Sequence, residues 1–439
     1  MAPSPTARLG RTATLLADGK VLLAGGCQAA ATPATACGPL TAAAELYDPS
    51  RNKWSATADM TVARVGHSAT LLPDGKVLVA GGCAAPPAGS PGCFPATEQR
   101  SAELYDPSSG KWSPTGEMTV GHLRHSATLL PSTLTATCGA VLAVGSSIDP
   151  STNTTGEADA EVYDAASGTW SPTAPSQLGR AKHTATLLQN GKVLVVGGVL
   201  ALTNTPTGRS ELYDPAKAAW SPTGTDDAAP RFFGHSATLL PGGEVLVAGG
   251  TGIAEGARKQ AQLYDSRAAP DPANPQVGGG AWRTTGSLAV ERSYHTATLL
   301  ADGSVLVAGG ADDASTELYD PIAGEWKPAG TMPSAAAGSA VKSASSPSGL
   351  PTSAATLLSD GSVLVIGPGF ADRYDHGAVG ATSQPGRPQS APSTCGGKTG
   401  RPIWLIAVVA GAVLGGAALL VVLVRRKRAS GRAAEAPAS

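Results

Sequence analysis

The chain has 439 residues, of which 55 are glycine and 35 are proline, and its net charge at neutral pH is −1. This glycine and proline content indicates many turns and argues against a helical fold. No run of basic residues occurs before residue 425, so the sequence offers no surface for nucleic acid, which requires clustered Lys and Arg.

One phrase returns along the chain and sets the order of the expected elements. It reads RTATLLADGKVLLAGG from Arg11, and close copies begin at His67, His183, His235 and His295, with more divergent copies at His125 and Ser353. The seven starts are separated by 52 to 60 residues. This period is typical of a propeller blade with some long loops, so seven starts predict seven blades.

Each copy predicts the first two strands of a blade, because two apolar runs flank Asp-Gly, Asn-Gly or Gly-Gly, which favour a tight hairpin turn. A third run ends at a tyrosine, and a fourth begins at a tryptophan. The tyrosines are Tyr47, Tyr105, Tyr163, Tyr213, Tyr264, Tyr319 and Tyr374; the tryptophans are Trp54, Trp112, Trp170, Trp220, Trp282 and Trp326. Each blade is therefore expected to have four strands.

The seventh blade lacks a tryptophan that would mark its fourth strand. Met60, Met118 and Met332 each follow a repeat tryptophan by six residues, and Met1 precedes the first strand in a similar way. We interpret Met1 as a repeat methionine. The natural chain is then expected to begin upstream, with the missing strand and a signal peptide.

The recurring Gly-Gly pair, Tyr-Asp and Trp resemble the Kelch repeat, over roughly residues 8–375. The resemblance implies an all-β, seven-bladed Kelch-type β-propeller of four-stranded blades, with the last blade incomplete. It also implies that strand one lines the central channel, and the small residues of Ser-Ala-Thr suit that crowded axis.

Beyond the propeller at 1–375, the sequence predicts a Gly/Ser/Pro-rich linker at 376–401, a transmembrane helix at 402–424 and a basic tail at 425–439. The uninterrupted apolar stretch from Ile403 to Val424 would measure about 33 Å as a helix, enough for a hydrocarbon core of about 30 Å. The basic residues that follow place the tail in the cytoplasm and the propeller outside.

Cysteine spacing agrees with an outward placement. Cys27 and Cys37 occupy the loop between strands two and three of blade one, and Cys83 and Cys93 occupy the same loop of blade two. Two pairs with like spacing predict two local disulfides, which persist in an oxidising compartment. Free thiols or a metal are the alternative, and Cys138 and Cys395 have no evident partner.

A basic residue precedes strand one by three or four positions in six blades, and these residues are candidate ligands for an acidic glycan or peptide. They are Arg8, Arg64, His122, Arg180, Arg231 and Arg292. The alternative is structural, because Glu45, Glu103, Glu161, Glu211 and Glu317 also recur, and Arg–Glu pairs within each blade would explain both sets.

Catalysis requires residues that depart from the repeat, and few do. Five of the seven histidines are repeat positions, interpreted as packed or hydrogen-bonded residues at the start of strand one, and neither His122 nor His376 has metal-ligand spacing around it. Tyr294 is the one tyrosine outside strand three, and it precedes a repeat histidine. We therefore predict no metal, no cofactor and no enzymatic activity.

Kelch propellers nevertheless include enzymes, so a carbohydrate-active enzyme, galactose oxidase-like or sialate mutarotase-like, is the alternative. The first would need a Tyr–Cys crosslink with a second Tyr and two His around copper. The second would need converging Arg and Glu residues. The sequence places no Cys to crosslink a Tyr.

The preferred interpretation is a membrane-anchored, extracellular protein- or carbohydrate-binding module that serves recognition or adhesion. In an antiparallel meander, loops two-to-three and four-to-one share one face of the ring. Loops two-to-three are longest in blades one to four, at 28–43, 84–101, 147–159 and 199–209. Variable loops on a rigid scaffold are common recognition sites, so an unknown protein or glycan partner is expected on this face.

Overall fold

The chain divides into two units, Met1–Cys395 and Gly396–Ser439. The computed structural model describes residues 8–28, 38–84, 98–132, 135, 138–145, 160–201, 203, 205–223, 232–252, 256–269, 279–311, 313–332, 354–367 and 370–375. Among these residues no helix has the length and apolar character needed to span a bilayer. The predicted linker, transmembrane helix and tail at 376–439 lie outside them.

Seven antiparallel sheets form the blades in the described part of the first unit, and six of them have four strands. Blade one contains β2 (Thr12–Leu15), β3 (Val21–Ala24), β5 (Ala44–Asp48) and β6 (Lys53–Ala56). Blade two contains β7 (Ser68–Leu71), β8 (Val77–Ala80), β9 (Ala102–Asp106) and β10 (Lys111–Pro114). Blade three contains β11 (Ser126–Leu129), β12 (Val141–Val144), β13 (Ala160–Asp164) and β14 (Thr169–Pro172).

The remaining blades follow the same order. Blade four contains β16 (Thr184–Leu187), β17 (Val193–Val196), β19 (Ser210–Asp214) and β20 (Ala219–Pro222). Blade five contains β21 (Ser236–Leu239), β22 (Glu244–Ala248), β25 (Ala261–Asp265) and β26 (Ala281–Thr284). Blade six contains β27 (Thr296–Leu299), β28 (Val305–Ala308), β29 (Ser315–Asp320) and β30 (Glu325–Thr331). Blade seven contains β31 (Ala354–Leu357), β32 (Val363–Gly367) and β33 (Phe370–Tyr374).

Three short strand pairs accompany the blades; two continue the hairpin of strands one and two, and the third lies between strands two and three of blade five. They are β1 (Arg8–Leu9) with β4 (Cys27–Gln28), β15 (Arg180–Ala181) with β18 (Val199–Leu200), and β23 (Thr251–Gly252) with β24 (Gly256–Ala257). Each pair involves residues next to strand one or strand two of its blade.

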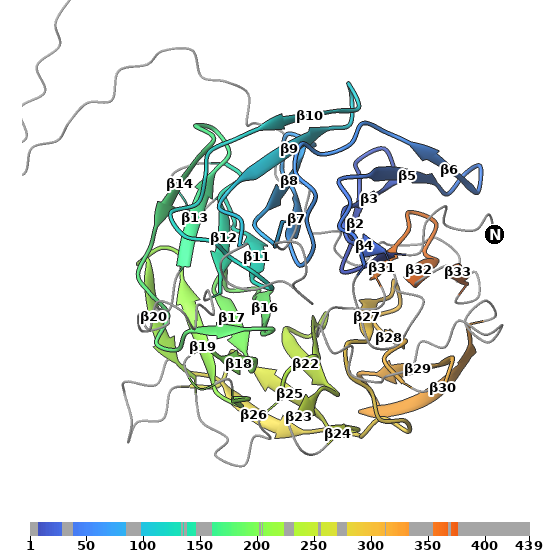
Figure 1. The fold of residues 1–439 in the computed structure, drawn as a ribbon. Helices are drawn as coiled ribbons and strands as arrows, with labels where there is room; N and C mark the ends of the chain where they lie inside the picture. The colour runs from blue at the N-terminus through green and yellow to red at the C-terminus, as the bar shows by residue number, and fades with distance from the viewer. Residues whose placement is uncertain are drawn as a thin grey trace, which may run out of the picture. The chain divides into compact units, whose positions relative to one another are not determined.

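The sheets close into a ring. The first strands of consecutive blades contact one another in the order β2, β7, β11, β16, β21, β27 and β31, and β31 contacts β2 again. Figure 1 shows these strands around the centre, with the fourth strands at the rim. The seven-bladed propeller and the lining of the channel by strand one are therefore confirmed.

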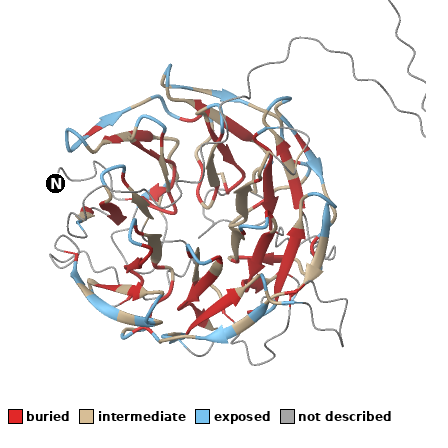
Figure 2. Cartoon of the chain, turned by 180° about the vertical axis from the view of Figure 1, so that it is seen from behind, coloured by how far each residue is buried: buried red, intermediate tan, exposed pale blue. Residues whose placement is uncertain are grey.

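The core lies between neighbouring blades, because strand two is buried on both of its faces. In β3, Leu22 and Ala24 pack against blade two, whereas Val21 and Leu23 pack against blade seven. Strand four is mostly exposed, as the pale blue rim of Figure 2 shows. A single sheet could not bury both sides of its second strand, so each blade depends on its two neighbours.

The repeat tyrosines connect the outer parts of the blades. Tyr105 of blade two lies 5.0 Å from its cross-strand partner Trp112, measured between ring centroids, and its hydroxyl is 2.8 Å from Thr57 Oγ1 of blade one. The same hydroxyl contact joins Tyr163 to Thr115 at 2.7 Å. These aromatic residues are thus packing and joining elements, as their recurrence predicts.

Blade seven has three strands within the described residues, as expected from the missing tryptophan. The neighbouring blade one shows the consequence. Tyr47 forms its hydrogen bond locally, to Asn52 Oδ1 at 3.0 Å, where blades such as the second use a threonine that follows strand four of the preceding blade. The predicted upstream strand remains a prediction.

Candidate functional site

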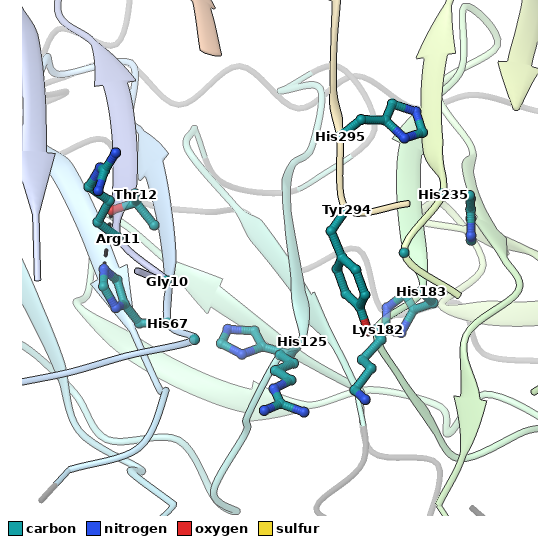
Figure 3. A pocket seen from close by; sticks show the side chains of 13 residues that line it. Gly10, Arg11, Thr12, His67, His125, Lys182, His183, His235, Tyr294 and His295 are labelled. Carbon is teal, nitrogen blue, oxygen red and sulfur yellow. Dashed lines mark hydrogen bonds between the residues drawn. The ribbon is translucent and has the colours of Figure 1, made fainter. Parts of the chain in front are cut away.

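A cavity of about 280 Å³ lies at the centre of the ring, lined by residues that immediately precede or begin strand one in blades one to six. In Figure 3, Arg11 and His67 stand on one side of this cavity and His235 and His295 on the other. Because these residues precede strand one, the cavity lies at the end of the ring where the four-to-one and two-to-three loops run.

Six residues form what we call the inner collar: Gly10, Gly66, Arg124, Lys182, Gly234 and Tyr294. Each stands directly before the first residue of its repeat phrase, and each has a positive φ, between 55° and 67°. Backbone hydrogen bonds join members of the collar from neighbouring blades. Arg124 N donates to Gly66 O at 3.0 Å, and Lys182 N donates to Arg124 O at 3.2 Å.

Three members of the inner collar carry side chains where the others are glycine. Glycine adopts a positive φ without steric penalty, whereas Arg124, Lys182 and Tyr294 do so at φ 55°, 58° and 55°. Residues held in this region cluster at functional sites. The repeat would accept glycine at all three positions, so these side chains are the strongest candidates for function in the cavity.

The repeat histidines are structural, as predicted. His125 Nε2 lies 2.9 Å from Ser68 Oγ of the preceding blade, and the same contact joins His183 to Ser126 at 2.8 Å. Burial lowers the pKa of His183 to about 3, so this ring is neutral at physiological pH. The histidines therefore join neighbouring first strands and add no positive charge to the cavity.

Arg11 breaks this pattern at the junction between blades seven and one. It occupies the repeat-histidine position of blade one, and it is only 7% exposed. Its Nη1 donates to the carbonyl oxygen of Arg8, but Nε and Nη2 are buried and have no hydrogen-bond partner among the described residues. Burial and the neighbouring charge of Arg8 lower its pKa to about 10, so the guanidinium stays charged at neutral pH.

The other cavity groups add positive charge and a hydroxyl. Burial, with the charge of Arg124, lowers the pKa of Lys182 to about 8, and its Nζ lies 4.9 Å from the centroid of the Phe233 ring. Burial raises the pKa of Tyr294 to about 12, so its hydroxyl stays protonated. The lining contains no Asp or Glu among the described residues. The cavity is cationic at neutral pH.

Five of the six basic residues predicted from the sequence lie outside this cavity, in buried pairs. Arg64 Nη2 is 3.1 Å from Glu103 Oε1, and Arg64 Nη1 donates to the carbonyl oxygens of Gly81 at 3.0 Å and Ser101 at 2.8 Å. Equivalent pairs are Arg8–Glu45 at 2.7 Å, His122–Glu161 at 3.1 Å, Arg180–Glu211 at 2.5 Å and Arg292–Glu317 at 3.1 Å.

These pairs favour the structural interpretation, which the sequence offers as the alternative. The five basic side chains are almost fully buried, and four of their glutamates also accept backbone N–H groups of the preceding loop, as Glu103 does from Thr61 at 2.7 Å. Arg231 lies outside the described residues. A role of the six residues in ligand binding stays a prediction. The contacts of the five described ones are with their own blade and the preceding loop, and do not support that role.

The cysteine predictions fall partly on residues that the structure describes. Cys27, Cys83 and Cys138 belong to disulfides, whereas Cys37 and Cys93 lie outside the described residues. The pairing of Cys27 with Cys37 and of Cys83 with Cys93 stays a prediction. For Cys138 the sequence suggests no partner.

No set of three or more His, Cys, Asp or Glu side chains in the described ranges is close enough together to hold a metal ion. Copper chemistry of the galactose oxidase kind would need two Tyr and two His around one ion. In the cavity, the histidine Nε2 atoms are instead engaged by Ser or Thr hydroxyl groups, as for His235 and Thr184 at 2.9 Å. The described residues therefore do not fit that centre.

The inner collar is the part of the site that sequence reasoning missed. A signal exists, since the residue before the repeat histidine is Gly in blades two and five but Arg, Lys or Tyr in blades three, four and six. From the sequence, Tyr294 stands out only as the neighbour of a histidine. That it has a positive φ and lines the cavity becomes visible only in the structure.

Comparison with known proteins supports the fold. A family model described as the Kelch motif matches residues 64–119, the segment that contains blade two. A search of curated proteins gives no match. A solved structure described as a novel fungal alcohol oxidase with catalytic diversity among the AA5 family, in complex with copper, has 18% identity and a TM-score of 0.59, over 83% of this chain and 71% of that one.

A second solved structure, that of YjhT, has 15% identity and a TM-score of 0.53, and the match covers 75% of this chain and 99% of that chain. At identities this low, the two structural matches establish a shared fold only. Function has to be argued from the site itself.

Proposed function

Because this chain is a Kelch repeat-containing protein whose blades form a closed propeller, we propose that it is a non-catalytic binding module that takes its ligand at the central cavity. One observation carries the proposal: Arg124, Lys182 and Tyr294 adopt a positive φ at inner-collar positions that line the cavity. The described lining contains no Asp or Glu that would neutralise the two cations. Such a lining supplies hydrogen-bond donors and charge for binding.

Among the described lining residues a single group, Lys182, suits catalysis by general acid and base, which needs a group that changes protonation near the working pH. The cavity histidines are neutral, because burial lowers their pKa values to about 3 for all but His125, whose pKa is also lowered by burial. Tyr294 is held protonated, because burial raises its pKa to about 12. Among these groups only Lys182, with a pKa of about 8, titrates close to neutrality.

The setting that we propose for this module is the outer surface of a membrane. It rests on the apolar stretch at 403–424, on the basic residues that follow it and on the cysteine spacing. A protein or glycan would approach the end of the ring that bears the two-to-three loops of blades one to four. The cavity lies at that same end, so a ligand could contact the loops and the inner collar together.

A carbohydrate-active enzyme is the second candidate, favoured by the fold that the chain shares with a fungal alcohol oxidase. The two functions differ in one measurable respect. A binding module leaves its ligand unchanged, whereas an oxidase would consume oxygen with a sugar alcohol or sugar substrate, and a mutarotase would change the anomeric ratio of a free sugar.

Glycan and peptide arrays probed with the full-length chain test the proposal. A variant that carries Arg124→Gly, Lys182→Gly and Tyr294→Gly should lose at least about tenfold in affinity for the ligand that the parent binds, while folding normally because glycine tolerates the same φ. A matched control, Ala218→Gly, replaces a residue with φ 47° that does not line the cavity, and this variant should bind like the parent. Undiminished binding by the triple variant would reject the cavity as the site.

A further inference from the structure

We propose that the central cavity binds a small oxyanion, a carboxylate or phosphate group, through the guanidinium of Arg11. This inference rests on the proposed function, because it assigns a ligand class to the same cavity. Its starting point is the junction between blades seven and one, where the repeat changes at two positions that face each other.

At the five junctions between blades one and six, a repeat histidine meets a hydroxyl on the first strand of the preceding blade. His67 meets Thr12 at 3.1 Å, and His295 meets Ser236 at 2.8 Å. At the junction of blades seven and one, Arg11 replaces the histidine, and the repeat register places Ala354 where the hydroxyl residue would be. Both halves of the contact are thus changed, and the arginine loses the partner that its position normally has.

The change leaves a buried cation with spare donors. Arg11 is 7% exposed, and in the part of the chain that the structure describes its Nε and Nη2 have no hydrogen-bond partner. The described carboxylate that most affects its charge is Glu45, which is already paired with Arg8 at 2.7 Å. A buried charge without a full set of partners is destabilising, so its presence in a cavity is explained if a ligand completes its contacts.

An oxyanion fits the donors that remain. A guanidinium presents its N–H groups as a planar fork that matches the two oxygens of a carboxylate or phosphate. Lys182 and Arg124 line the same cavity and add positive charge, and Tyr294 adds a hydroxyl donor. A volume of about 280 Å³ is suited to a small molecule or to the end of a larger one.

Thermal unfolding of the full-length chain at constant ionic strength tests the inference. Glucuronate, inorganic phosphate and glucose serve as probes, since glucose matches glucuronate in size but has no carboxylate. Glucuronate or phosphate should raise Tm in a saturable manner. The anion that does so shows whether the cavity prefers a carboxylate or a phosphate group. Glucose should produce no comparable shift.

Arg11→Met should abolish this saturable shift, and Lys182→Met should weaken the apparent affinity at least about fivefold. Without ligand, Arg11→Met should unfold at the parent's Tm or above it, because it removes a buried charge, and this shows that the variant is folded. Arg51→Met is the matched control: the Arg51 side chain is 80% exposed, and the variant should respond to anions like the parent.

Two results would overturn the inference: no saturable shift with either anion, or the same shift in Arg11→Met as in the parent. The proposed function would survive either result if the arrays reveal a neutral ligand whose binding is lost in the triple glycine variant. The two proposals can therefore fail separately.

Discussion

At the scale of single residues, the repeat separates residues that hold the ring together from residues that distinguish the cavity. Arg64 and Glu103 recur in equivalent form in other blades and form a buried ion pair, with 3.1 Å between Arg64 Nη2 and Glu103 Oε1. Their recurrence marks them as structural. Arg11, Arg124 and Lys182 depart from the repeat at positions that line the cavity, as Tyr294 does. Departure from the repeat is thus the better guide to function in this propeller.

The repeat histidines predict how stability depends on pH. Burial lowers the folded-state pKa of His67 and His235 to about 3, whereas the unfolded chain has a value near 6.5. Below about pH 6.5 the unfolded chain binds protons that the folded chain does not, so the free energy of unfolding should fall as the pH decreases from about 6.5 towards 3. Each such histidine contributes at most about 1.4 kcal/mol per pH unit.

Urea unfolding at about pH 7.5, 6.5 and 5.5 measures this dependence. His67→Gln should reduce the slope below about pH 6.5 by about one proton relative to the parent, because one histidine no longer titrates in the unfolded chain. Stability that does not change over this acidic range would show that the histidines are protonated in the folded ring.

At the scale of elements, the Gly-Gly pair after strand two explains how the blades approach each other. Gly25 has φ 63°, and a Cβ there would lie 2.7 Å from both the Arg64 carbonyl oxygen and His67 Cε1 of blade two. Neither neighbour can move far, because each belongs to the contacts that join the two blades. Close packing between blades therefore requires this glycine.

Gly25→Ala should destabilise the ring by about 3 kcal/mol, through the cost of a positive φ and the clash with blade two. Gly75→Ala is the matched control, since Gly75 has φ 86° but an added methyl group would meet nothing within 4 Å, and it should cost about 1 kcal/mol. Chemical denaturation compares the two. Equal losses would mean that the approach of blade two does not constrain Gly25.

At the scale of the whole molecule, the propeller was predictable from the sequence because each blade carries its own signals. The hairpin glycines, the Tyr–Trp pairs and the apolar second strands are local features, and their recurrence predicts a ring. The cavity was harder to predict, because its lining comes from six blades, and its charged side chains from three of them, which meet only when the ring closes. The Arg11–Ala354 exception becomes informative only when blade seven is known to adjoin blade one.

Hydrogen–deuterium exchange of the full-length chain, with and without a ligand found on the arrays, tests binding at the central cavity most directly. The account predicts ligand-dependent protection at the inner collar, in peptides that contain Arg124, Lys182 and Tyr294, with little change in the fourth strands at the rim. Protection confined to the rim strands, with the inner collar unchanged, would contradict it.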